Sequence, residues 1–292
     1  MKVNLHVTEK CNFHCKQCYA KFEEHSAPST EEWMNIIDNC HSSEMVNAYN
    51  FAGGEPLLFK GLNQLIRHAH SKGAAVSIIT NGYLINDAWI EENAKYLDTI
   101  GFSIDSFSSD TLRNIGRCTC SGKILEPERL ADIITKLKAA NPKIRIKLNS
   151  VVSALNKNEN LAEDILNYDL PVSRWKLLKM CPFKNENFSN YDLAVSDTEY
   201  QNFVHRNTVT LNAVKSSSML YNTDNGMEIV AEDRINGGYI MIDAGGYLVD
   251  DTLNTNYTRI IDCKTEDFRT GIDRLNLDKE LYEARYSVKE AS

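Results

Sequence analysis

The sequence predicts an α/β fold, with a partial barrel of about six strand–helix units over residues 1–184 and an extension over residues 185–292 that closes its lumen. Three observations support this prediction. Short β-type runs alternate with helical stretches, as in repeated βα units around a parallel sheet. Several of these runs carry polar residues on one face. A loop with three cysteines follows the first run directly.

The first two thirds of the chain contain the strand–helix pairs in order. The first strand (VNLHVT, 3–8) is followed by a helix near Thr30 to Cys40, with Thr30 as its N-cap. The second helix is closed by Gly73, because glycine commonly ends a helix. The remaining strands are expected at 48–51, 74–80, 99–105, 144–152 and 172–179, and the remaining helices at 61–73, 87–96, after Ser108 and at 126–140.

The pattern weakens beyond about Asn185. The segment YIMIDAGGYLVDD (239–251) predicts a hairpin that turns at Gly245 and Gly246. The rest of this extension gives no strong signal, and we see no low-complexity segment.

Composition narrows the class of protein. A chain of 292 residues with 42% hydrophobic and 25% charged residues can bury a full core. Its net charge of −8 argues against a nucleic-acid surface, although a local basic pocket is compatible with it. No apolar run approaches a membrane span, and too few residues precede Cys11 for a signal peptide. We therefore expect a cytoplasmic protein without disulfides and without a membrane partner.

The stretch CNFHCKQCY places Cys11, Cys15 and Cys18 in one loop. A structural zinc site needs four ligands, which usually arrive as two pairs, and the other five cysteines supply no second pair. Three thiolates at this CxxxCxxC spacing fit a 4Fe–4S cluster in which one iron stays open for another ligand. Three unconnected thiols would leave the spacing without a reason.

The strand-like runs also predict a polar lumen. Asn4 and His6 share one face of the first run, opposite Val3 and Leu5. A later run alternates in the same way and places Lys147 and Asn149 on one face. Because unpaired buried charges are costly, a lumen with such residues predicts a binding site. Arg145 and Arg174 fit equally well on a solvent-exposed face of an edge strand.

These residues resemble the radical S-adenosylmethionine (SAM) enzymes, whose fold is a partial (β/α)6 barrel. The resemblance lies in the CxxxCxxC loop, in FAGGEP at Phe51–Pro56, and in ITNGYLI and FSIDSF. It implies a 4Fe–4S cluster held by the three loop cysteines and SAM bound beside it. The SAM contacts that it implies are Gly53, Gly54, Glu55, Thr80, Asn81, Ser103 and Asp105.

A narrower resemblance covers most of the chain. The segments IGR, KLNS, RWK and GGYIMIDAGGY are similar, in order, to the pattern of the viperin family of antiviral enzymes. That resemblance implies a lyase-type dehydratase that uses a 5′-deoxyadenosyl radical. Its substrate would be a nucleoside triphosphate (CTP, UTP or GTP), and its product the 3′-deoxy-3′,4′-didehydro analogue, a chain terminator. The amphipathic membrane helix of the animal proteins has no counterpart before the first strand.

The same resemblance assigns substrate residues and partners. Arg117, Lys147 and Lys176 would hold the phosphates, with Lys123 and Lys179 as further candidates. Asn4, His6 and Asn149 would contact the base or ribose, and Tyr239 would donate the final hydrogen atom. A flavodoxin or ferredoxin would supply electrons, and we expect a monomer.

Two other functions remain open from the sequence. A radical SAM enzyme that modifies a peptide would use the same cluster and barrel, and the hairpin at 239–251 is similar to segments of such enzymes. An auxiliary cluster would need more cysteines than Cys181 and Cys263. An iron–sulfur electron carrier or sensor would need a fully ligated cluster and has no use for the GGEP segment.

Overall fold

A computed structural model describes residues 1–18, 27–182, 184–185, 188–217, 226–234, 236–252 and 257–286. Six parallel strands follow one another side by side and form the centre of a curved sheet. The predicted set of strand–helix units is therefore confirmed. The strands are β1 (Lys2–His6), β2 (Ala48–Ala52), β3 (Ala75–Thr80), β4 (Thr99–Ser103), β5 (Arg145–Val152) and β6 (Arg174–Lys179).

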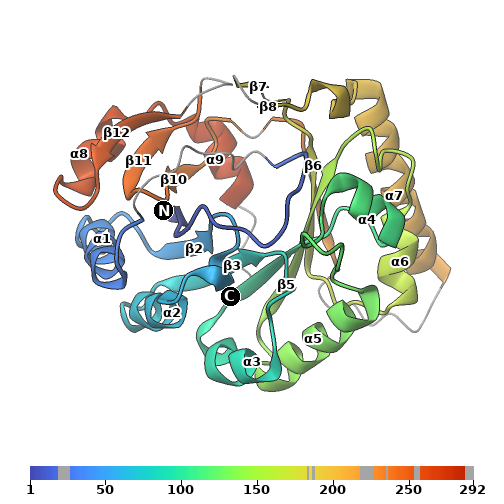
Figure 1. Ribbon diagram of the computed structural model, residues 1–292, viewed down its shortest axis with the longest axis horizontal. Coiled ribbons are helices and arrows are strands. Elements are labelled where there is room, and N and C mark those ends of the chain that lie inside the picture. The colour runs from blue at the N-terminus through green and yellow to red at the C-terminus, as the bar shows by residue number, and fades with distance from the viewer. Residues whose placement is uncertain are drawn as a thin grey trace.

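The helices that follow these strands line the outside of the curved sheet, as Figure 1 shows. A short helix, α4 (Ser109–Ile115), stands between β4 and the longer helix of the same unit. The other helices that follow the strands are α1 (Thr30–Ser42), α2 (Leu62–Ser71), α3 (Asp87–Asn93), α5 (Pro127–Ala140), α6 (Leu161–Asn167) and α7 (Asp197–Ser217). Short 3-10 turns lie at Pro56–Leu58, Ala94–Tyr96 and Tyr191–Leu193.

The apolar face of each strand packs outward on these helices. Val3 and Leu5 of β1 are fully buried, and so is Trp33 of α1, in one continuous core. Burial of this apolar area is the main term that holds strand and helix together. The polar residues of the alternating strands lie on the opposite face of the sheet. We call the space that this inner face encloses the lumen.

Two predicted helix boundaries were wrong in detail. The N-cap of α1 is Ser29 and not Thr30, because the Ser29 hydroxyl accepts from the Glu32 N–H while the Glu32 carboxylate accepts from the Ser29 N–H. The helix predicted at 87–96 ends at Asn93 and continues as the 3-10 turn. The short helix after Ser108 is confirmed, with the Ser108 hydroxyl as its cap.

The extension contains more structure than the sequence suggested. The predicted hairpin is confirmed as β10 (Ile240–Ile242) paired antiparallel with β11 (Tyr247–Asp250), and Gly246 turns with φ +87°. The remaining elements are the two-stranded pair β7 (Lys184–Asn185) and β8 (Phe188–Ser189), strands β9 (Glu228–Glu232) and β12 (Thr258–Asp262), and helices α8 (Phe268–Arg274) and α9 (Lys279–Tyr286).

The extension lengthens the central sheet at both ends. Strand β9 pairs parallel with β6, and β10 pairs parallel with β1. The complete sheet has ten strands, in the order β12-β11-β10-β1-β2-β3-β4-β5-β6-β9. It curves without closing, as expected for a partial barrel. The division of the chain at residue 184 into core and extension stays a prediction.

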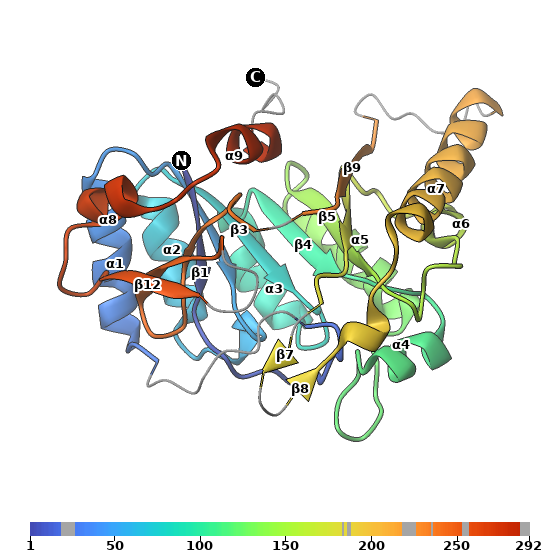
Figure 2. The same cartoon turned by 90° about the horizontal axis from the view of Figure 1, so that it is seen from above.

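Helix α9 spans the open side of the sheet, between the β1 side and the β9 side (Figures 1 and 2). The Tyr282 hydroxyl accepts from the Lys2 N–H of β1 at 2.6 Å. On the other side, the Arg285 carbonyl accepts from the Arg174 guanidinium of β6 at 3.1 Å. The last described helix therefore joins the two ends of the parallel core.

Over the described ranges, no helix combines the length and the apolar character that crossing a membrane requires.

Candidate active site

The cysteine loop rests on the loop after β2. The N–H groups of Gly54 and Glu55 donate to the carbonyls of Thr8 and Lys10 at 2.7 and 2.8 Å. Gly53 has φ +140°, and a Cβ on Gly54 would overlap the Lys10 carbonyl. Two glycines are needed here because the two backbones touch.

The other side of the cysteine loop rests on the IGR segment after α4. The His14 N–H donates to the Gly116 carbonyl at 3.1 Å, and the Lys16 N–H donates to the Ile115 carbonyl at 2.8 Å. Gly116 has φ +81°, and a Cβ there would lie 2.5 Å from the His14 carbonyl oxygen. Backbone contacts on both sides thus fix the path of the loop.

The three loop thiols lie near one another and near the surface. Cys11 is exposed, and Cys15 and Cys18 are half-buried. Burial raises the pKa of Cys15 to about 12, an effect that the nearby Arg117 guanidinium opposes. Bound iron would therefore have to stabilise the thiolate, because thiolates are the form that binds metals.

The loop carries the donor chemistry of a 4Fe–4S cluster, whose thiolates bind separate irons. Among the residues that the structure describes, no group of three or more His, Cys, Asp or Glu side chains is arranged to hold a metal ion. The Phe13 N–H lies 3.4 Å from Cys11 Sγ, and Asn81 Nδ2 lies 3.9 Å from it. Such N–H groups beside a sulfur ligand stabilise the reduced, more negative cluster.

Glu55 lies between the cysteine loop and the end of β3. Its side chain is only 1% exposed, and its carboxylate accepts from Thr80 Oγ1 at 2.7 Å, from the Asn81 N–H at 2.8 Å and from the Leu57 N–H at 3.2 Å. Burial raises its pKa to about 7. A carboxylate held this way has room for one more donor, such as an ammonium group, and a cation there would restore its charge.

Asp105 and Arg117 were predicted in different roles, and the structure brings them together. Arg117 Nε donates to Asp105 Oδ2 at 2.6 Å, and a second guanidinium nitrogen pairs with the same oxygen. The other carboxylate oxygen accepts from the Val151 N–H at 2.8 Å. Arg117 lies beside the cysteine loop, whereas Lys147 and Lys176 lie farther along the sheet. Ser103 is half-buried at the end of β4.

The lumen begins with a hydrogen-bonded row of polar side chains. Asn50 Nδ2 donates to Asn4 Oδ1 at 2.9 Å, and Ser77 Oγ donates to Asn50 Oδ1 at 2.9 Å. His6 is 2% exposed, and burial lowers its pKa to about 4, so its imidazole is neutral at neutral pH. Asn149 lies level with Ser103 and Lys176 in the sheet register.

A group of basic side chains lines the lumen between β1, β5, β6 and α9. Lys147 stands among them, and within the described part of the chain it has no ion-pair partner. Burial lowers its pKa well below the usual value, and the neighbouring Lys176 and Arg174 lower it further. We define the basic cluster as Lys2, Lys147, Arg174, Lys176 and Arg285.

Arg145, in contrast, is exposed at the start of β5 and stays outside this cluster. For this residue the solvent-exposed alternative is correct. Arg174 is half-buried, and its Nε lies 3.3 Å from Glu228 Oε2.

Tyr239 lies directly against the basic cluster. Its hydroxyl donates to Glu232 Oε2 at 2.9 Å and accepts from Lys176 Nζ at 3.2 Å. The Arg285 guanidinium lies 4.1 Å from the centre of the Tyr239 ring. Gly238 leaves space for this arginine, because a Cβ on Gly238 would overlap it.

Sequence reasoning missed Glu232 and Arg285. Glu232 ends β9, a strand that was not predicted, and Arg285 lies on α9, a helix that was not predicted either. One signal was available for Glu232. In the run EIVAE, Glu228 and Glu232 flank three apolar residues and are separated by an even number of positions, which places both on the same face of a strand.

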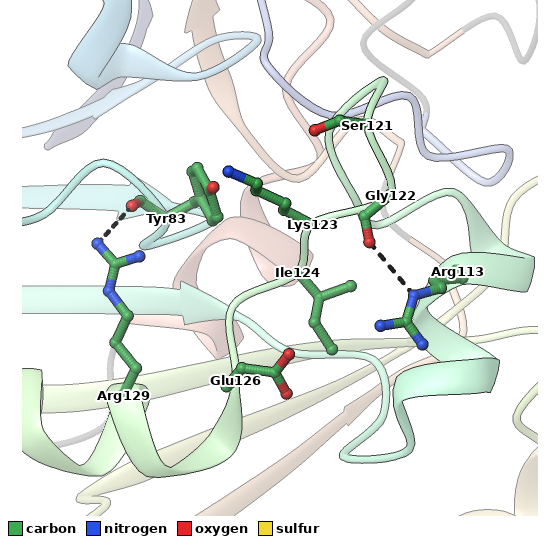
Figure 3. Close-up of a pocket in the computed structure, with 8 residues that line it drawn as sticks. All are labelled: Tyr83, Arg113, Ser121, Gly122, Lys123, Ile124, Glu126 and Arg129. Atoms are coloured by element: carbon green, nitrogen blue, oxygen red, sulfur yellow. Dashed lines mark hydrogen bonds between the residues drawn. The ribbon is translucent and has the colours of Figure 1, made fainter.

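The further lysine candidates lie away from the cluster. Lys179 forms an ion pair with Asp197. Lys123 is exposed on an open groove of about 540 Å³ between the β3 and β4 loops, which Figure 3 shows with Tyr83, Arg113 and Arg129. Arg129 donates to the Tyr83 carbonyl at 2.8 Å, and Arg113 Nε donates to the Gly122 carbonyl at 3.2 Å.

This fold and loop define a class of enzyme. The radical SAM superfamily profile matches residues 5–152, about half of the chain. Native anSMEcpe with bound AdoMet and the Kp18Cys peptide has a TM-score of 0.72 and 15% identity to this chain, and covers 99% of this chain and 85% of that one. At this identity the likeness concerns the fold alone. The protein belongs to the radical SAM superfamily, whose cofactors are a 4Fe–4S cluster and SAM.

Closer relatives narrow the class to one family. An S-adenosylmethionine-dependent nucleotide dehydratase of Selenomonas ruminantium is 38% identical over 289 residues, 98% of each chain. One of Pseudoalteromonas ulvae is 33% identical over 227 residues, 71% of each chain. The chain is a member of the S-adenosylmethionine-dependent nucleotide dehydratases, the viperin family.

Proposed function

We propose that this protein converts a nucleoside triphosphate (CTP, UTP or GTP) into its 3′-deoxy-3′,4′-didehydro analogue, with antiviral defence as the role of the product. The single observation that carries the proposal is the basic cluster facing Tyr239 in a polar lumen. Among the described residues, ion pairs join Arg174 to Glu228 and join Lys176 and Arg285 to Glu232, whereas Lys147 stands beside Lys176 and Arg174 with no ion pair there. A fold that holds like charges together in this way favours a small polyanion, and a triphosphate carries about three to four negative charges.

The cofactor residues follow from the geometry at the other end of the lumen. Cys11, Cys15 and Cys18 would hold the cluster. Glu55 would accept from the amino group of SAM, beside the backbone of Gly53 and Gly54. The other residues proposed to line this SAM site are Thr80, Asn81, Ser103 and Asp105, with Arg117 fixing the position of Asp105.

A cluster and SAM held by these residues would supply the 5′-deoxyadenosyl radical chemistry that removes a hydrogen atom from the ribose 4′ carbon. Lys147 and Lys176 would hold the phosphates, and Asn4, His6 and Asn149 would contact the base or ribose. Exclusion of water from the lumen would protect the substrate radical.

Tyr239 would complete the product. Loss of the 3′ hydroxyl as water consumes one proton, and closure of the double bond needs one electron. A hydrogen atom from the Tyr239 hydroxyl supplies both and leaves a tyrosyl radical. The contact between this hydroxyl and Lys176 supports the role, because Lys176 would hold the substrate beside it.

The deciding experiment incubates the reduced protein with SAM and each nucleoside triphosphate in turn. We expect 5′-deoxyadenosine and a didehydro nucleotide in similar amounts with at least one of them, and neither with the corresponding nucleoside. SAM cleavage without any nucleotide product would contradict the proposal and favour another substrate, such as a peptide. A protein that binds the cluster and never cleaves SAM would be a carrier or sensor.

Lys147→Ala and Lys176→Ala are each expected to weaken triphosphate binding by roughly 1 to 3 kcal/mol, the range for charge-assisted hydrogen bonds. SAM affinity should stay nearly unchanged. Calorimetric titration with nucleotide and with SAM separately measures both. Lys143→Ala, on an exposed residue before β5, serves as the control and should change neither affinity.

The two substitutions should differ in their effect on folding. Lys176→Ala leaves the buried Glu232 carboxylate with one cation fewer. The melting temperature of this variant should therefore fall. Lys147→Ala removes repulsion between like charges and should not lower it. Equal loss of SAM and nucleotide binding in either variant would indicate misfolding and contradict the assignment.

Triphosphate binding should also weaken at alkaline pH. Burial lowers the pKa of Lys176 to about 8, against the opposing effect of Glu232. As pH rises through this value, the free protein loses the positive charge that the phosphates need. A bound polyanion raises the pKa again, so affinity should fall by up to about tenfold per pH unit above pH 8. Titration of wild type and Lys176→Met across this range tests it, and an equal decline in both would rule out Lys176 as the cause.

For the remaining partners we propose a flavodoxin or ferredoxin as the electron donor, a monomeric protein, and a cytoplasmic location. A reducing compartment suits all eight cysteines, since those in the described structure are free thiols. The exposed Cys11 leaves the cluster loop accessible to a donor protein.

A further inference from the structure

Glu232 is the centre of the contacts around Tyr239. One carboxylate oxygen forms an ion pair with Lys176 Nζ. The other accepts from the Tyr239 hydroxyl at 2.9 Å and lies 3.2 Å from Arg285 Nε. The side chains of Glu232, Lys176 and Arg285 are 6%, 5% and 2% exposed, so water does little to screen these charges.

The Glu232 carboxylate occupies the position where the negative charge of the substrate would pair with Lys176. Lys176 has Glu232 as its nearest anion, and Arg285 shares the same carboxylate. A triphosphate that reaches Lys176 would place a second anion beside Glu232. Two anions beside the same buried cation repel each other strongly. Glu232 and the phosphate chain therefore cannot both keep full contact with Lys176.

We infer that Glu232 is an internal anion that occupies Lys176 and Arg285 until the phosphate chain of the substrate replaces it, and that releases the Tyr239 hydroxyl when it is displaced. The inference deepens the proposed function and rests on it for the identity of the anion. In this scheme Glu232 contacts the Tyr239 hydroxyl only until it is displaced, so it takes no part in the hydrogen transfer and acts as a positioning and specificity residue.

Two consequences follow from the arrangement. Only an anion with several charges can compete with a carboxylate that has two cationic partners, so Glu232 raises the selectivity for triphosphate over monophosphate. The Tyr239 hydroxyl donates to Glu232 Oε2. The hydrogen donor is therefore held by Glu232 until a substrate with its phosphates has arrived.

The test is Glu232→Gln, which keeps the size of the side chain and removes its charge. Binding of inorganic tripolyphosphate to the cluster-loaded protein is measured by calorimetry in slightly acidic buffer. This favours the protonated form of Lys176 in the variant as well, where loss of Glu232 removes an interaction that raises the pKa of the lysine. We expect the dissociation constant to fall by about tenfold, which corresponds to about 1.4 kcal/mol. The ratio of monophosphate to triphosphate dissociation constants, measured with one nucleotide series, should fall as well.

Glu228→Gln is the matched control. It makes the same change on the same strand, at a carboxylate that pairs with Arg174 and is 32% exposed. Its effect should stay below about threefold, because a partly exposed pair is screened by water. An equal gain in Glu228→Gln would mean that general charge and not competition at Lys176 is responsible, and would overturn the inference.

Glu232→Asp covers the case in which the glutamine variant does not fold. It keeps the charge and draws the carboxylate back by one methylene, so it should bind tripolyphosphate more tightly than wild type by about threefold. Unchanged or weaker binding in the folded variant would overturn the inference. The proposed function is judged separately, by didehydro nucleotide formation in wild type, so the two can fail independently.

Discussion

Cys11→Ala is expected to bind little iron and to form no 5′-deoxyadenosine from SAM, because a cluster with two of its three protein ligands is not retained. The fold should survive. The Cys11 side chain is exposed, and backbone contacts with the β2 and α4 loops hold the cysteine loop in place. The free energy of unfolding of the iron-free protein should therefore change by less than about 0.5 kcal/mol.

The measurement combines iron content, the absorbance of the reconstituted cluster and the yield of 5′-deoxyadenosine. Cys181→Ala is the control, since Cys181 lies outside the loop and is also partly exposed. It should keep iron and activity. A Cys11→Ala protein with the wild-type yield of 5′-deoxyadenosine would disprove the cluster assignment.

Tyr239→Phe is expected to keep SAM cleavage and lose most of the didehydro product. The ring keeps its position over Arg285, at 4.1 Å from the guanidinium, so packing and nucleotide binding persist. Only the hydroxyl is lost, together with its contacts to Lys176 and Glu232. The substrate radical would then lack its nearby hydrogen donor.

The quantity to measure is the amount of didehydro nucleotide per 5′-deoxyadenosine in one reaction. Tyr247→Phe is the control, because Tyr247 lies on β11 and its ring contacts Arg259 and Lys264 instead. It should behave as wild type does. If Tyr239→Phe leaves the ratio unchanged, the hydrogen comes from another group.

The parallel core was predictable because each of its units is a local pattern. β-type runs, helix caps and turn glycines stand in the right order along the chain, and the alternation in VNLHVT places Asn4 and His6 on the polar face of β1. The CxxxCxxC spacing marks the cysteine loop in the same local way. The GGE segment could be matched by resemblance, but its reason lies in the close contact of Gly54 with Lys10.

What could not be predicted depends on pairing over long distances. No local feature of Ile240–Ile242 says that this strand pairs with β1, and the lumen partners of Lys176 come from β9 and α9. Asp105 and Arg117 were predicted to have different roles. Their ion pair forms because the folded chain brings the segment after β4 next to the segment after α4. The sequence shows which residue types are present for such a site, whereas tertiary packing determines which side chains come into contact.

The pairing of β1 with β10 also has a consequence for how the protein is made. The backbone edge of β1 that faces β10 has no partner until Ile242 has left the ribosome, on the order of tens of seconds after β1 itself at typical synthesis rates. The loops that hold the cysteine loop, at Gly54 and Gly116, emerge in the first half of synthesis.

The contacts of the cysteine loop with Gly54 and Gly116 can therefore form before Glu232, Tyr239 and Arg285 exist to build the opposite side of the lumen. The contact of Asn190 with the Lys16 carbonyl of the loop follows later in synthesis. Until the last strands arrive, the open edge of β1 needs protection from pairing with other nascent chains.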